Sequence, residues 1–95
     1  MFIPINGPGD QTNLSVSTSP QEVKVGASRL DQRTVITIQP LDGDIYFGYN
    51  SGTLTSSTGT KIFQGQYFPL EAADSLAVYV VAASGTVDVR ITEVG

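Results

Sequence analysis

A strict alternation of apolar and polar residues near the end of the chain constrains the fold more than any other feature. Val87, Val89 and Ile91 share one face of an extended chain, and the same spacing places Glu93 with them. The residues between them are polar and fall on the opposite face. A period of two is that of a β-strand with one buried face. This segment therefore predicts a half-exposed strand.

The segment just before it predicts a partner for this strand. Residues 76–82 are apolar on both faces, as in a strand covered from two sides. Residues 83–86 form a short polar turn in which Gly85 can adopt positive φ without steric cost. We expect a β-hairpin over residues 76–94. Since a lone hairpin is unstable in water, further strands must pack against it.

The upstream sequence supplies such strands. A second hairpin is predicted from residues 33–39 and 45–49, joined at the Asp42-Gly43 turn signal. Shorter strands are expected over 21–25, 61–64 and 66–70. In the last, Pro69 is expected at a sheet edge or at a strand end because it cannot donate to a ladder. The strands recur roughly every 8 to 12 residues without any long helical period. This pattern predicts an all-β fold of about seven to eight strands, an antiparallel β-sandwich or a jelly-roll-like barrel.

The first twenty residues differ from the rest. Proline and glycine punctuate them, so we expect no regular strand pairing there and divide the chain into an extended N-terminal arm (1–20) and a β-sandwich domain (21–95). The arm begins with an apolar plug, which either frays or folds back on its own core, or docks on a neighbouring subunit. The plug consists of Phe2, Ile3, Pro4 and Ile5.

Composition excludes several classes of function. The chain has no histidine and no cysteine, which rules out disulfides, thiolate or imidazole catalysis and the usual zinc or copper sites. Its net charge is -4, and its five basic residues are scattered, which disfavours nucleic acid as a partner. We find neither a secretion signal nor an apolar run long enough to span a bilayer, so we expect no membrane partner and synthesis in a cytoplasm-like compartment.

No residue pattern predicts catalysis. Asp42 and Asp44 resemble half of a calcium loop, but the further oxygen ligands are missing and a turn explains the pair. A serine nucleophile would need a base, for which only Lys24 or Lys61 is available, and neither has a recognisable partner. We therefore expect a protein that is not an enzyme, with no catalytic residue, no metal site and no cofactor.

Two groups of residues are candidates for a protein interface. Arg33 and Arg90 lie among apolar strand residues, where each forms either an ordinary surface ion pair or a bidentate contact, with Asp31, Asp88 or a partner subunit. Tyrosines are enriched at the centres of protein interfaces, although they also serve as core residues. The tyrosines in question are Tyr46, Tyr49 and Tyr67.

The region from Val23 to Val94 resembles small virion proteins of tailed bacteriophages. The shared pattern is a valine-rich strand, an "R-x-x-x-x-x-Q" strand, a "Y-x-G" strand, a glycine-containing loop and a closing "SGT-x-DVR-x-x-E" strand. The matching residues are Arg33, Gln39, Tyr46, Gly48, Gly59, Ser84, Gly85, Thr86, Asp88, Val89, Arg90 and Glu93. Members of this family look like β-sandwich modules of capsid decoration (cement) proteins, head fibres, tails or baseplates.

The resemblance implies a virion structural protein that binds and stabilises the assembled capsid. Its partners would be the major capsid protein and further copies of itself, with a trimer favoured, and its location would be the capsid surface after synthesis in the host cytoplasm. One alternative is a tail or baseplate adaptor or host-recognition module that uses the polar loop over residues 50–60. Another is a small carbohydrate-binding sandwich, which would need its tyrosines in a flat row.

Overall fold

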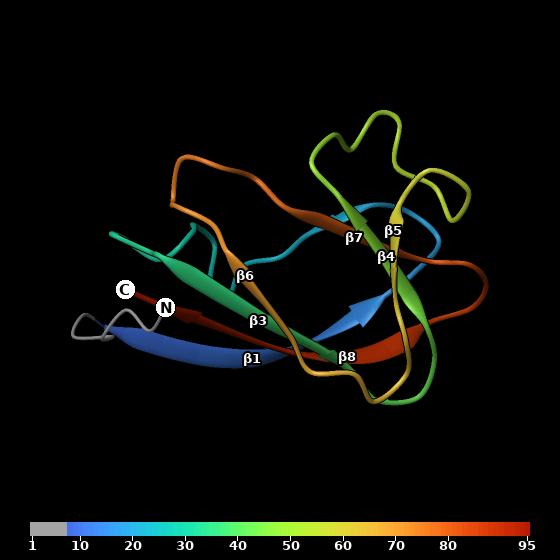
Figure 1. Cartoon of the computed structure of the whole chain (residues 1–95), viewed down its shortest axis with the longest axis horizontal. Helices are drawn as coiled ribbons and strands as arrows, with labels where there is room; N and C mark the ends of the chain where they lie inside the picture. The colour runs from blue at the N-terminus through green and yellow to red at the C-terminus, as the bar shows by residue number, and fades with distance from the viewer. Residues whose placement is uncertain (1–7) are drawn as a thin grey trace.

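The computed structural model describes residues 8–95, which form two packed four-stranded antiparallel sheets (Figure 1). The predicted β-sandwich is confirmed, and the two sheets do not close into a barrel. The described part has no helix that is long and apolar enough to cross a membrane. In spatial order, the first sheet contains β1 (Gly9–Val16), β8 (Val87–Val94), β3 (Val35–Pro40) and β6 (Phe68–Glu71). The second contains β2 (Gln21–Glu22), β7 (Tyr79–Ala82), β4 (Ile45–Gly48) and β5 (Thr60–Ile62).

The chain passes from one sheet to the other at every connection except that between β4 and β5. This strand order is that of an eight-stranded double-sheet jelly roll. Both predicted hairpins are therefore wrong as hydrogen-bonded pairs. β3 and β4 belong to different sheets, as do β7 and β8, so each pair faces across the core. The turn signals predicted where the chain reverses direction. A reversal alone does not decide whether the two strands hydrogen-bond within one sheet or face each other across the core.

The expectation of no regular pairing over residues 1–20 is wrong for β1. Its eight residues pair with β8 along their whole length, from Gly9 opposite Val94 to Val16 opposite Val87. The physical reason is that Pro8 and Pro20 flank the strand and do not interrupt it. Thr12, Leu14 and Val16 provide an inward face of its own.

The core lies between the inward faces of the two sheets. The alternation in β8 is confirmed, since Val87, Val89, Ile91 and Glu93 are all buried. The core consists mainly of β-branched side chains, which pack well on pleated sheets. Its buried members are Val16, Val23, Ile36, Ile38, Ile45, Phe47, Ile62, Ala72, Val78, Val80, Ala82, Val87, Val89 and Ile91.

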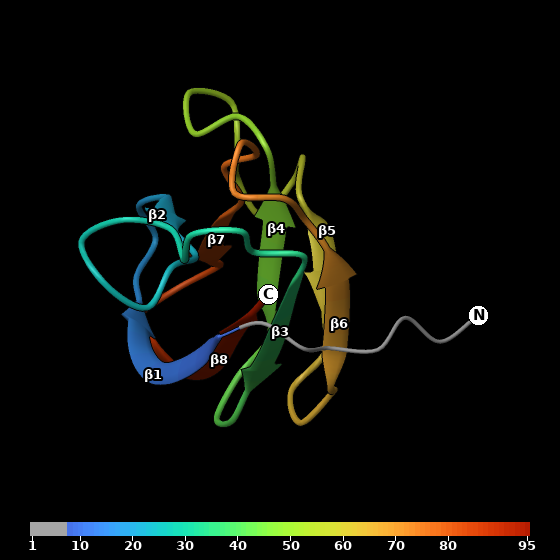
Figure 2. The same ribbon diagram turned by 90° about the vertical axis from the view of Figure 1, so that its left-hand side faces the viewer.

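The connections between strands fall into two groups at opposite ends of the sandwich. Four short ones, residues 17–20, 41–44, 63–67 and 83–86, lie at what we call the short-loop end. Three longer ones, residues 23–34, 49–59 and 72–78, lie at what we call the long-loop end. Figure 2 shows β1 and β2 on one side of the sandwich and β5 and β6 on the other.

Candidate interaction surface

Two connections at the short-loop end are locked together by hydrogen bonds. The backbone N–H of Gly65 donates to the Pro40 carbonyl at 2.7 Å. The backbone N–H of Gln64 donates to Asp44 Oδ1 at 2.7 Å, and the Gln64 side chain donates to the Leu41 carbonyl at 3.3 Å. Gly65 has a φ of 79°, a conformation that glycine adopts without steric cost. The connections 41–44 and 63–67 therefore form one ordered platform.

This platform exposes three large apolar side chains. Leu41 is 37% exposed, Phe63 is 59% exposed and Tyr67 is 64% exposed. We call these three residues the short-loop patch. Large exposed apolar side chains that gather in one region mark interaction sites more often than scattered ones do. The patch thus offers an aromatic contact surface on a backbone that is already ordered.

A charged pair borders the patch. Lys61 Nζ lies 4.9 Å from the centre of the Phe63 ring and 3.4 Å from Asp44 Oδ2. The N–H of Gln64 that donates to Asp44 holds the pKa of this carboxyl below its ordinary value. Burial opposes this shift, and the Lys61 ammonium adds to it. The carboxylate is therefore ionised at neutral pH and fixes both the loop and the lysine beside the patch.

The structure separates the three predicted interface tyrosines. Tyr67 belongs to the short-loop patch. Tyr49 is 53% exposed but follows β4 at the long-loop end, where its ring stands edge-on to Phe47 with centroids 6.0 Å apart. Tyr46 is half-buried on β4, opposite Lys61 of β5. They do not form the flat row that a carbohydrate-binding sandwich would need.

Phe63 and Leu41 were not predicted as interface residues. Sequence reasoning placed Phe63 in a short strand without assigning it a face. Ile62 next to it is fully buried, so strict alternation along that strand would have predicted an outward Phe63. Leu41 follows β3 directly, in the connection that crosses between the sheets, and no periodic signal marks it.

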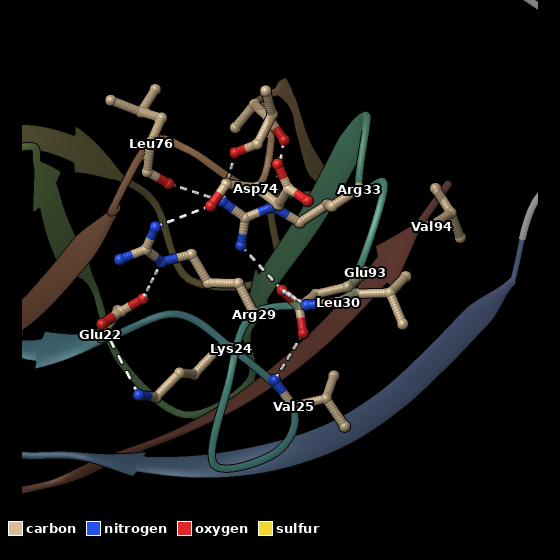
Figure 3. A network of polar contacts seen from close by, with 12 residues as sticks. Glu22, Lys24, Val25, Arg29, Leu30, Arg33, Asp74, Leu76, Glu93 and Val94 are labelled. Atoms are coloured by element: carbon tan, nitrogen blue, oxygen red, sulfur yellow. Dashed lines mark hydrogen bonds and ion pairs between the residues drawn. The ribbon is translucent and has the colours of Figure 1, made fainter.

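Arg33 is not a surface residue, and the expectation of an ordinary surface ion pair is wrong for it. Its side chain is 0% exposed and its partner is the buried Glu93, not Asp31 or Asp88. The distance from Arg33 Nη1 to Glu93 Oε2 is 2.7 Å (Figure 3). In this fold the guanidinium has no surface with which to contact a partner subunit.

The guanidinium of Arg33 organises the long-loop end. Its Nε donates to the Ala72 carbonyl at 3.1 Å, and its Nη2 donates to the carbonyls of Ala73 and Leu76 at 2.8 Å and 2.6 Å. Glu93 in turn accepts the backbone N–H groups of Val25 and Leu30, at 2.8 Å and 3.3 Å. One ion pair therefore ties the connections 23–34 and 72–78 to the last strand. We call this set of contacts the buried ion-pair cluster.

A second layer of charges covers the same end. Arg29 donates to Glu22 Oε2 at 2.8 Å and to the Asp74 carbonyl at 2.7 Å, and Lys24 lies 3.7 Å from Glu22. The hydrogen bond to Glu22 raises the pKa of the Arg29 guanidinium above its ordinary value. These residues line a shallow pocket of about 380 Å³. Both cations of the pocket are already paired with Glu22, so neither is free to hold an anion.

Of the two alternatives considered for Arg90, the structure shows the ordinary surface ion pair, with Asp88. Arg90 Nη2 lies 3.3 Å from Asp88 Oδ2, and both side chains are well exposed on the outer face of β8. The two carboxylates considered for a calcium loop serve other roles. Asp42 accepts the backbone N–H of Asp88 at 2.8 Å, while Asp44 accepts that of Gln64. Across residues 8–95 no cluster of three or more acidic side chains could hold a metal ion.

The apolar plug at the start of the chain lies outside the described residues. Its members, Phe2, Ile3, Pro4 and Ile5, remain a sequence-based hypothesis for an interface.

No protein-family model, no curated protein and no solved structure matches this chain.

Proposed function

We propose that this chain is a non-enzymatic structural protein of a virion that binds the assembled capsid of a tailed phage and stabilises it. The observation that carries the proposal is the short-loop patch, which presents Leu41, Phe63 and Tyr67 on a hydrogen-bonded platform. Aromatic anchors of this kind dominate the energetics of protein interfaces. Because the platform is ordered before binding, little conformational entropy is lost when the patch is buried.

A protein with this function would work by mass action. A partner that binds only the assembled shell lowers the free energy of that state, and many copies add their contributions. Such a role requires a rigid module and a binding surface. The sandwich and the short-loop patch meet both requirements, and the resemblance to virion proteins agrees with them. The partners in this proposal are the major capsid protein and further copies of the chain, at the capsid surface.

Co-sedimentation with expanded, protein-depleted capsid shells tests the proposal. We expect saturable binding by the wild-type protein. Replacing Phe63 and Tyr67 together by serine should weaken it by about 30-fold or more, the effect of losing roughly 2 kcal/mol of hot-spot energy. Leu76→Ser is the matched control, because Leu76 is 39% exposed at the opposite end of the sandwich. Equal binding by the double variant and the wild type would reject the patch as the capsid-binding surface.

One observation favours a second candidate, a tail or baseplate adaptor or host-recognition module. The connection 49–59 is polar, yet it is folded by its own hydrogen bonds, with Thr58 Oγ1 donating to the Thr53 carbonyl at 2.8 Å. Leu54, 6% exposed, anchors it against the strands. A displayed loop that is held in one shape, beside the exposed Tyr49, suits recognition of another surface. Binding to a host surface that Tyr49→Ser abolishes, with no binding to shells, would favour this candidate.

A further inference from the structure

Among the residues that the structure describes, β1 pairs with a strand on one side only, that of β8. Gly95 donates to the Pro8 carbonyl at 2.8 Å, so even-numbered residues of β1 bond to β8. Odd-numbered residues therefore direct their backbone N–H and C=O groups away from the sheet. A contact at Gln11 agrees with this alternation, because its outward N–H donates to the carboxylate of the neighbouring Asp10 at 2.9 Å. The outward residues are Gly9, Gln11, Asn13 and Ser15.

The other three sheet edges carry the features that prevent strand addition. β6 contains Pro69, β5 has only three residues and includes Lys61, and β2 has only two residues. Short edges, lysine and proline are the usual means by which proteins block edge-to-edge pairing. β1 has eight residues, without any lysine, arginine or proline, and pairs with β8 in an unbroken register. Within residues 8–95, β1 is thus the one sheet edge of four that is long and regular and has none of these blocking features.

We propose that β1 pairs with β1 of a second copy of this chain, antiparallel about a two-fold axis at Thr12. This register sets Gln11 opposite Asn13 of the other copy and Gly9 opposite Ser15. Every outward backbone donor and acceptor of the four residues then has a partner, with the Asp10 contact to Gln11 exchanged for a ladder bond. The first sheets of the two copies join into one continuous sheet.

The side chains of β1 favour a second copy as the occupant of this edge. In the two-fold register the amides of Gln11 and Asn13 lie opposite each other on the outer face, where each can donate and accept. The only charged residue, Asp10, lies opposite Leu14 and not opposite its own equivalent. The strand is therefore complementary to itself, as a two-fold interface requires.

The pairing leaves the short-loop patch free. Figure 2 shows β1 on one side of the sandwich, with the connection between β5 and β6 on the other. A pair of chains would therefore present two patches, one from each copy. Pairing through β1 involves only copies of this chain and does not depend on binding to a capsid.

Light scattering after size exclusion, over a series of protein concentrations, tests the pairing. We expect the wild type to approach twice its 10.0 kDa mass as concentration rises. Asn13→Pro should stay at 10.0 kDa, because it removes an outward N–H without touching the ladder to β8. Asn13→Ala, which keeps that N–H, is the matched control and should still pair. Circular dichroism checks that both variants fold.

Hydrogen exchange of the wild-type backbone provides a measurement that needs no variant. The amides of Gln11, Asn13 and Ser15 should become protected as concentration rises. A wild type that stays monomeric, a trimer, or fast exchange of these amides within the oligomer would overturn the proposal. A monomer whose binding to shells is lost in Asn13→Pro but not in Asn13→Ala would also overturn it, and would assign the edge to an extended segment of the shell protein.

Discussion

The buried ion-pair cluster gives the sharpest prediction about stability. Replacing Glu93 by glutamine keeps the shape of the side chain and removes its charge. Glu93 Oε1 accepts from Val25, and Oε2 accepts from Arg33 and Leu30. A glutamine has one oxygen and one NH₂ group, so either orientation sets a donor against a donor. The Arg33 guanidinium also loses the only carboxylate it contacts among residues 8–95 and stays buried with its charge.

The magnitude follows from these contacts. Removing one partner of a buried ion pair costs about 3 to 5 kcal/mol, since an uncompensated charge remains inside. A domain of this size has a free energy of unfolding of about 5 to 15 kcal/mol, so the change removes a large fraction of it. Each kcal/mol corresponds to about 4 to 8 °C in the melting temperature, so Glu93→Gln should melt at least about 12 °C lower.

Replacing both partners by apolar residues should not rescue the protein. Such double replacements are often neutral elsewhere. Here they would leave the carbonyls of Ala72, Ala73 and Leu76 and the N–H groups of Val25 and Leu30 without their present partners. Unsatisfied buried polar groups each cost about 1 to 3 kcal/mol.

Urea unfolding, followed by circular dichroism, measures these changes. Arg90→Ala is the control, because it breaks an exposed ion pair that contributes about 0 to 1 kcal/mol. If Glu93→Gln changed the free energy of unfolding by no more than this control does, the cluster would not organise the long-loop end as argued.

Two further substitutions follow from the loops. Gly59→Ala should destabilise the fold by about 1 to 3 kcal/mol, because a Cβ there would meet Leu54 Cδ1 and Tyr46 Cβ, both at 2.8 Å. Gly26→Ala is the control and should not destabilise the fold, because a Cβ there would meet nothing nearer than 3.9 Å. Equal melting temperatures of the two variants would refute the close packing around Gly59. The lowered pKa of Asp44 means that its ionised form stabilises the fold above the unfolded value of about 3.9, and that this contribution is lost as pH falls through the folded pKa. The stability difference between wild type and Asp44→Asn should therefore be constant from neutral pH to about pH 5 and shrink in more acidic solution, and a difference that grew on acidification would contradict this.

Local patterns predicted the strands after residue 20 but missed β1, which lies between Pro8 and Pro20. The alternation in β8 predicted both its extent and the inward position of Glu93. Of the two places expected for Pro69, a sheet edge or a strand end, the structure shows the edge. The pairing of strands could not be predicted in the same way. Asp42-Gly43 and Ser84-Gly85 mark chain reversals, but only long-range packing decides that the reversals cross between sheets.

The period-two pattern of the strand could not predict that Arg33 is buried, for a specific reason. Gln32, just before it, has a φ of 59°, a left-handed conformation that non-glycine residues rarely adopt. Its N–H donates to Asp74 Oδ2 at 2.9 Å, which ties this turn to the connection 72–78. The turn interrupts the period of two before β3 begins. The inward direction of Arg33 is therefore set by contacts distant in sequence.

Electron cryomicroscopy of expanded capsid shells saturated with this protein would test the central claim most directly. The account predicts added density at discrete junctions between capsid subunits, with the sandwich oriented so that the short-loop patch faces the shell. Shells without added density, or sandwiches that face the shell with the long-loop end, would contradict it.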